Sequence, residues 1–197
     1  MGHNAPVSGI ARAILEGAML HELPDGTKVR LRFIAPSDKP LLADGVRALS
    51  PQSRRLRFHA PKDELSAEEL RRFTEVDGYD HVAIVAVLDA DPGRLAGVAR
   101  FVRDPARPER AEVAITVCDE LQGMGLGRAL GLALADVART LGVRRFTASL
   151  LGTNMAAHRL FHAISRRVDT AYSAGIADLV VELETREHPI VPSALAA

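Results

Sequence analysis

The sequence predicts a mixed α/β domain of the α+β type, with a sheet that is largely antiparallel in its first half. Two observations support this prediction. The expected elements run strand, two helices, three strands, helix, strand, helix, two strands, and a glycine-rich loop leads from a strand into an amphipathic helix. Of the 197 residues, 47% are hydrophobic and 25% are charged, which is the composition of a globular protein with an ordinary core.

The first half of the chain carries clear signals for strands and helices. Residues 28–34 alternate charged and apolar side chains, as a half-buried strand does. Ser66 and Glu69 form an S-x-x-E capping box, which opens a helix. Residues 81–88 are almost continuously apolar, which favours a central strand. In chain order we expect a strand at 28–34, helices from 37 or 38 to about 49 and from 66 to 73, strands at 81–88 and 94–103, a polar loop at 104–110, and a strand at 111–118.

The second half is dominated by one strong amphipathic helix. Its apolar positions recur with the 3.6-residue period from Leu126 to Leu141, and Gly142 is expected to end it. After it we expect a strand at 145–151, a helix from 154 to about 164 capped by Thr153 or Asn154, and strands at 172–174 and 177–184 joined at Gly175.

Charge and composition exclude several classes of protein. Lys plus Arg and Asp plus Glu each number 25, so the formal net charge is zero, which argues against a nucleic-acid-binding protein. No run of 18 apolar residues and no signal-peptide pattern occur, so we expect no membrane span. Cys118 is the single cysteine, which suits a reducing cytoplasm. We expect an N-terminal arm or short helix at 1–24, the domain at 25–186 and a surface tail at 187–197.

The loop from Gln122 to Arg128 is the most informative stretch. Its three alternating glycines allow the backbone to come close to a ligand. The free N–H groups and the dipole at the start of the following helix favour a phosphate or pyrophosphate, to which Arg128 can add a contact. A P-loop would need Gly-Lys-[Ser/Thr], and a dinucleotide fingerprint would need glycine at position 128. A glycine-rich turn without a ligand stays open as an alternative.

The strand before this loop presents a single carboxylate on a face of small side chains. Side chains at 113, 115 and 117 are expected to face a core, and those at 112, 114, 116 and 118 the opposite side. Such a face, with Glu112 on it, is suited to a substrate cleft. The alternative is that Glu112 simply faces solvent on the outside of the sheet.

The loop resembles the cofactor motif of the GNAT (GCN5-related N-acetyltransferase) superfamily. The run Gln122-Gly123-Met124-Gly125-Leu126-Gly127 matches the signature Q/R-x-x-G-x-G/A, with a strand before it and a helix after it. Asn154 resembles the asparagine that commonly follows in that family, and the order of elements is similar from about 29 to 184. Residues 50–87 are also similar to the segment before this motif in bacterial GNAT protein-lysine acetyltransferases.

This resemblance implies a mostly antiparallel sheet with a splayed parallel strand pair, flanked by helices, and acetyl-CoA as co-substrate. The splayed pair would be 111–118 and 145–151, with the pantetheine along the first strand and an N–H near Val117 polarising the thioester carbonyl. Glu112 would be the catalytic base for the amine. The implied cofactor-binding residues are Thr116, Val117, Gln122, Gly123, Met124, Gly125, Leu126, Gly127, Arg128 and Asn154.

One departure from the family pattern bears on activity. Phe161 stands where many GNAT enzymes place a tyrosine that protonates the departing CoA thiolate, so a catalytically weak acyl-CoA-binding or sensor module stays open as an alternative. The acceptor amine is a protein lysine, as the likeness at 50–87 favours, or a small molecule. His158 and His162 are expected to be surface or packing residues, so we expect no metal. Residues 9–20 could pack against a second copy in a homodimer, or could fray.

Overall fold

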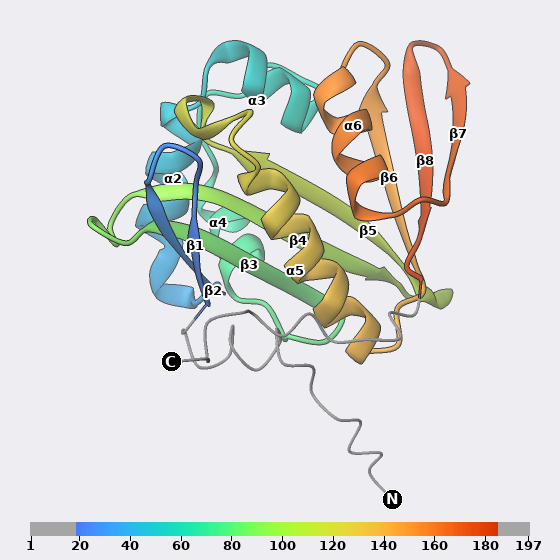
Figure 1. Cartoon of the computed structure of the whole chain (residues 1–197), viewed down its shortest axis with the longest axis horizontal. Helices are drawn as coiled ribbons and strands as arrows, with labels where there is room; N and C mark the ends of the chain where they lie inside the picture. The colour runs from blue at the N-terminus through green and yellow to red at the C-terminus, as the bar shows by residue number, and fades with distance from the viewer. Residues whose placement is uncertain (1–18, 185–197) are drawn as a thin grey trace, which may run out of the picture.

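A computed structural model describes residues 19–184, which form one eight-stranded sheet with helices on both faces (Figure 1). The strand order is β1-β2-β3-β4-β5-β6-β8-β7. The strands are β1 (Met19–Glu22), β2 (Lys28–Phe33), β3 (His81–Leu88), β4 (Leu95–Asp104), β5 (Arg107–Val117), β6 (Arg145–Leu151), β7 (Val168–Ser173) and β8 (Ile176–Glu182). The helices are α2 (Lys39–Ala48), α3 (Pro51–Phe58), α4 (Ala67–Thr74), α5 (Leu126–Thr140) and α6 (Met155–Ile164), with 3₁₀ turns η1 (Pro36–Asp38) and η2 (Asp119–Leu121).

Strands β3 and β4 are buried on both faces, which explains the continuous apolar run at 81–88. Ile84 of β3 and Phe101 of β4 belong to the core beneath α5 and α6, while Val85 and Val98 belong to a second core beneath α2 and α4. Figure 1 shows α5 crossing one face of the sheet and α2 and α4 on the other. The prediction of a central strand at 81–88 is confirmed.

The parallel pair β5 and β6 is joined over only a short distance. Their register covers three positions, from Arg110 with Arg145 to Glu112 with Thr147, although β5 continues to Val117. The other strand pairs are antiparallel. The two strands meet at the lower right of Figure 1 and separate toward α3 and α6. The expected sheet, mostly antiparallel with one splayed parallel pair, is confirmed.

Several boundaries differ from the sequence prediction. The polar loop expected at 104–110 is wrong at its C-terminal end, because Arg107 pairs with Asp104 and β5 begins there. Residues 51–58, where we expected no helix, form α3, with the Ser50 side chain accepting a hydrogen bond from the Ser53 N–H at 3.2 Å. Residues 19–22, assigned to the N-terminal arm, form the edge strand β1. Residue 168, rather than 172, begins β7.

The remaining parts of the predicted arm and tail, 1–18 and 185–197, lie outside the described residues. The segment proposed for contact with a second copy lies mostly among them. In the described range, no helix is long and apolar enough to cross a membrane.

Candidate functional site

A cleft of about 1020 Å³ opens where β5 and β6 part. Its floor is the end of β5, from Glu112 to Val117. One wall is the glycine loop and the start of α5, and another is α6. Helices α3 and α4 close the third side through Arg57, Phe58 and Phe73. A cleft of this size, formed by several elements around a few polar groups, is the usual form of a ligand site.

The glycine loop is held in a conformation that side chains disfavour. Gly123 and Gly125 have φ angles of 77° and 88°, in the left-handed region, and Gly125 is the N-cap of α5. A Cβ on either glycine would meet no atom within 4 Å. The backbone angle, rather than lack of space, is therefore the reason for glycine at both positions.

Gln122 fixes the loop to its surroundings. Its amide nitrogen donates to the Val117 carbonyl at 3.0 Å and to the Ser53 hydroxyl at 3.2 Å. The side chain thus joins the end of β5, the loop and the start of α3. This positioning role was not predicted from its place in the motif.

Nine of the eleven predicted site residues line the cleft. The side chain of Met124 packs against the main core, and Leu126 is fully buried within it, so neither faces the cleft. Any contact that these two make with a ligand would have to come from their backbone N–H groups. The nine are Glu112, Thr116, Val117, Gln122, Gly123, Gly125, Gly127, Arg128 and Asn154.

Asn154 is the N-cap of α6. Its Oδ1 accepts a hydrogen bond from the Ala157 N–H at 3.1 Å, which satisfies one free donor of the first turn. Of the two caps considered from the sequence, the structure has Asn154. The cap fixes the start of α6 against the cleft.

Glu112 stands at the last paired position between β5 and β6, where the strands begin to separate. Its register partner on β4 is Val102, so its side chain lies on the face of the sheet toward α3 and α4. The carboxylate is exposed within the cleft, and its charge acts on the nearby Arg57 guanidinium. The alternation predicted for 111–118 therefore places Glu112 on the cleft side.

Three arginines beside Glu112 were not among the predicted site residues. Arg57 comes from α3, Arg72 from α4 and Arg100 from β4, and all three line the cleft. The guanidinium carbons of Arg72 and Arg100 lie 4.9 Å and 4.4 Å from the centre of the Phe73 ring. The sequence does carry one signal for this cluster, because Arg100 is a charged residue in the middle of a strand whose neighbouring positions, 95–99 and 101–102, are apolar or glycine.

Burial and neighbouring positive charges lower the pKa values of Arg57, Arg100 and His81. Burial, followed by the charges of Arg57 and Arg72, lowers the pKa of Arg100 to about 9. Burial also lowers the pKa of Arg57, partly offset by Glu112. His81, whose Nε2 lies 3.3 Å from Arg100 Nη1, has its pKa lowered to about 4 by burial and by Arg100. His81 is therefore neutral at pH 7, while Arg100 still favours the charged form.

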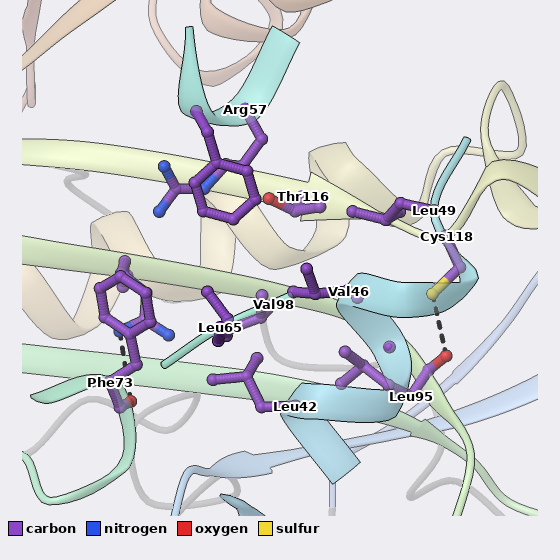
Figure 2. Close-up of a pocket in the computed structure, with 14 residues that line it drawn as sticks. Leu42, Val46, Leu49, Arg57, Leu65, Phe73, Leu95, Val98, Thr116 and Cys118 are labelled. Carbon is purple, nitrogen blue, oxygen red and sulfur yellow. Dashed lines mark hydrogen bonds between the residues drawn. The ribbon is translucent and has the colours of Figure 1, made fainter. Parts of the chain in front are cut away.

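A small apolar pocket of about 30 Å³ adjoins the cleft on the α2 side. Figure 2 shows Arg57 and Phe73 at one end of it and Leu95 and Cys118 at the other. The Cys118 thiol is buried and donates to the Leu95 carbonyl at 3.0 Å, and burial raises its pKa to about 11. A thiol in this state is a poor nucleophile, so Cys118 is a packing residue.

Phe161 lines the cleft from α6 and is almost fully buried. The residue therefore belongs both to the wall of the cleft and to the core beneath α5 and α6. Among the described residues that line the cleft there is no tyrosine.

Comparisons with known proteins agree with this geometry. The model of the acetyltransferase (GNAT) family matches residues 48–164. Acetyltransferase Pat of Mycolicibacterium smegmatis is 35% identical over 130 residues, which cover 66% of this chain but only 38% of that protein. Acetyltransferase PA5475 of Pseudomonas aeruginosa is 30% identical over 143 residues, covering 72% of this chain and 76% of that protein. The solved GNAT domain of S. lividans PAT superposes with a TM-score of 0.76 at 31% identity, covering 83% of this chain and 96% of that one.

Proposed function

Because the chain belongs to the acetyltransferase (GNAT) family, we propose that it transfers an acetyl group from acetyl-CoA to a primary amine in the cleft between β5 and β6. The observation that carries this proposal is the coincidence of three features in one cleft. These are the diverging parallel strands, the glycine loop at the start of α5, and a carboxylate at the point of divergence.

The cleft suits the parts of acetyl-CoA. The loop glycines and the N-terminal N–H groups of α5 favour the pyrophosphate. The side chain of Arg128 supplies a positive charge beside them. Beyond its last pair with β6, β5 has backbone N–H and C=O groups that are free to pair with the pantetheine arm. The arm would then lie beside β5 in the place of a neighbouring strand.

The backbone of Val117 is suited to polarise the thioester carbonyl. The neighbouring Cys118 N–H donates to the Ala96 carbonyl at 3.0 Å, on the β4 side. Because successive N–H groups of a strand point in opposite directions, the Val117 N–H faces the gap toward β6. It also lies beyond the last β5–β6 pair, so it is suited to an oxyanion-hole role.

Glu112 is the proposed general base. A lysine-like ammonium with a pKa of about 10.4 must lose a proton before it can attack. Val117 is five positions beyond Glu112, about 17 Å along a strand, so we propose that the proton passes to the carboxylate through water rather than by direct contact. The new N–C bond forms as the C–S bond breaks, and the CoA thiolate takes its proton from solvent, since Phe161 has none to give.

The finer assignments are also part of the proposal. A protein lysine or a small amine is the acceptor, the location is cytoplasmic, and a homodimer is the proposed assembly. The catalytically weak acyl-CoA-binding module is the alternative, because Phe161 replaces the usual acid. Turnover with a mixed pool of amines separates the two.

The first experiment is a thermal shift with acetyl-CoA, CoA, NAD and ATP in parallel. A ligand that binds only the folded protein, at a hundred times its Kd, adds about 2.7 kcal/mol to the free energy of unfolding. We expect a rise with acetyl-CoA and CoA alone. No rise with either would mean that the glycine loop serves another purpose.

The role of Glu112 is tested by the Glu112→Gln variant. We expect kcat to fall by roughly a hundredfold or more, because general-base catalysis contributes about that much, while acetyl-CoA still binds. Glu109→Gln, on the same strand but outside the cleft, is the matched control and should keep full activity. Unchanged turnover in Glu112→Gln would remove the residue from the mechanism.

A further inference from the structure

Two of the arginines beside Glu112, the buried Arg100 and the half-buried Arg57, lack the partner that charges removed from solvent normally have. Arg100 is only 5% exposed, yet its guanidinium meets a carbonyl, that of Phe73 at 3.2 Å, and the neutral His81 ring. Within residues 19–184, no carboxylate forms an ion pair with Arg57, Arg72 or Arg100. Buried cations are usually paired, so this arrangement is incomplete as it stands.

The charges in this part of the cleft do not balance. Glu69 also lines the cleft, but it is already paired with Lys62 at 2.9 Å. That leaves Glu112 as one carboxylate beside three guanidinium groups, and the neighbouring arginines help to lower the pKa values of Arg57 and Arg100. A bound anion would remove this repulsion, which is the pattern expected of a recognition site.

The position of Arg100 relates the cluster to the reaction. Arg100 is the register partner of Ala114, two residues from Glu112 and two from Thr116 on β5. Each step is about 7 Å, so the arginine stands between the proposed base and the end of β5 proposed for the thioester. A molecule whose anionic group meets Arg57 and Arg100 would hold its amine within the reacting region.

We propose that the acceptor is a small amino acid, whose carboxylate binds Arg57 and Arg100 while its amino group faces Glu112 and the thioester. The proposal rests on the proposed function and names its substrate class. Arg57 and Arg100 match the negative carboxylate of a zwitterionic amino acid, and Glu112 matches its positive ammonium group. Arginine is suited to this role because its planar fork binds a carboxylate through two parallel hydrogen bonds.

Depth favours a small molecule over an acidic peptide. The Arg100 side chain is buried beneath Phe73, and Arg57 is partly covered by its own helix and by Phe58. A lysine of a protein would bring a single cation into the cleft and leave any acidic neighbour at the rim, near the exposed Arg72. The deeper arginines would then remain without a partner.

The test compares amines that differ only in the carboxylate. With acetyl-CoA saturating, kcat/KM is measured for small, aliphatic, aromatic and acidic α-amino acids, and each is compared with its decarboxylated amine. The same constant is measured for lysine peptides with and without a neighbouring aspartate. We expect the best amino acid to exceed its decarboxylated partner by roughly ten- to a hundredfold, the value of a charge-assisted hydrogen-bond pair. Arg57→Gln should remove that preference and Arg57→Lys restore part of it.

Arg55→Gln is the matched control, because Arg55 lies on the same helix but is exposed and outside the cleft. It should keep the preference. Binding of the amino acid to the CoA-saturated protein, measured by calorimetry, provides a readout that needs no reaction. Arg57→Gln should weaken this binding and Arg55→Gln should not.

The outcomes separate the two proposals. Equal kcat/KM within each pair overturns the amino-acid assignment and leaves the acetyltransferase standing. Preference for the acidic lysine peptide over every free amino acid also overturns it, in favour of a protein acceptor. Binding of amino acids that depends on Arg57, without acetylation of any amine, supports the anion site and removes the proposed function.

Discussion

The left-handed glycine at the N-cap of α5 shows how one backbone angle supports the glycine loop. Gly125 has φ of 88°, and an added Cβ would meet nothing within 4 Å, so substitution acts through the backbone. We expect Gly125→Ala to cost about 1–2 kcal/mol of stability and to raise the Kd for acetyl-CoA by on the order of tenfold as the loop relaxes. Urea unfolding and calorimetry measure the two effects.

Gly26 supplies the control for that substitution. It has φ of 84° in the turn between β1 and β2, and a methyl group there would also have no atom within 4 Å. Gly26→Ala should cost similar stability and leave acetyl-CoA binding unchanged. If both variants weakened binding equally, general instability rather than the loop would be the cause.

His81 makes stability depend on pH. Its pKa falls from 6.5 to about 4 in the folded protein, through burial first and then the charge of Arg100. Between these values the unfolded chain binds more protons, so the free energy of unfolding should decrease as the pH drops from 6.5 toward 4. His81→Gln, which keeps an acceptor for Arg100, should flatten this part of the curve in urea titrations.

The exposed His162 on α6 is the comparison for His81. His162→Gln should follow the wild-type curve through the same pH range. A slope that persists in His81→Gln would assign the effect to other groups.

The junction of α3 with the glycine loop is made by one carboxylate. Asp119, in η2, accepts hydrogen bonds from the Ser50 N–H at 2.8 Å, the Ser50 hydroxyl at 2.8 Å and the Ser53 hydroxyl at 2.6 Å. The Ser53 hydroxyl also receives the Gln122 amide, at 3.2 Å. The helix that carries Arg57 is thus tied to the loop proposed for the pyrophosphate.

Loss of that junction should affect binding more than chemistry. We expect Asp119→Ala to raise KM for the acceptor by roughly five- to tenfold, since several hydrogen bonds of about 1 kcal/mol each hold α3, and to leave kcat within about twofold. Asp44→Ala removes another exposed carboxylate, paired with Arg47 on α2, and should change neither constant. A fall in kcat alone would place Asp119 in the chemical step instead.

Across the whole sheet, the short β5–β6 pairing leaves part of a central strand without a neighbour on one side. Residues 113–117 continue past the last pair at Glu112. We expect peptides covering 113–118 to exchange amide hydrogens faster than those covering 98–102, and to slow when acetyl-CoA is added. Exchange that is already slow and unaffected by acetyl-CoA would mean that the ligand does not lie along β5.

The sequence predicted most of this architecture because its signals are local. Periodicity located α5, and the capping box at Ser66 and Glu69 located α4, where both reciprocal hydrogen bonds form. The sheet edge β1 and the start of β5 at Arg107 were missed, since both depend on pairing with a distant or adjacent strand rather than on composition. The glycine loop was located by its motif, whereas the arginines come from three separate elements that only the fold brings together.

The unbalanced arginines have a consequence for how this protein would respond to engineering. Like charges removed from solvent without a counter-ion lower the stability of a folded protein, so under the proposed role this site would combine lower stability with substrate recognition. Selection for thermal stability alone should therefore replace Arg57 or Arg100 early. Under the proposed role, the most stable variants would be those that had lost substrate specificity.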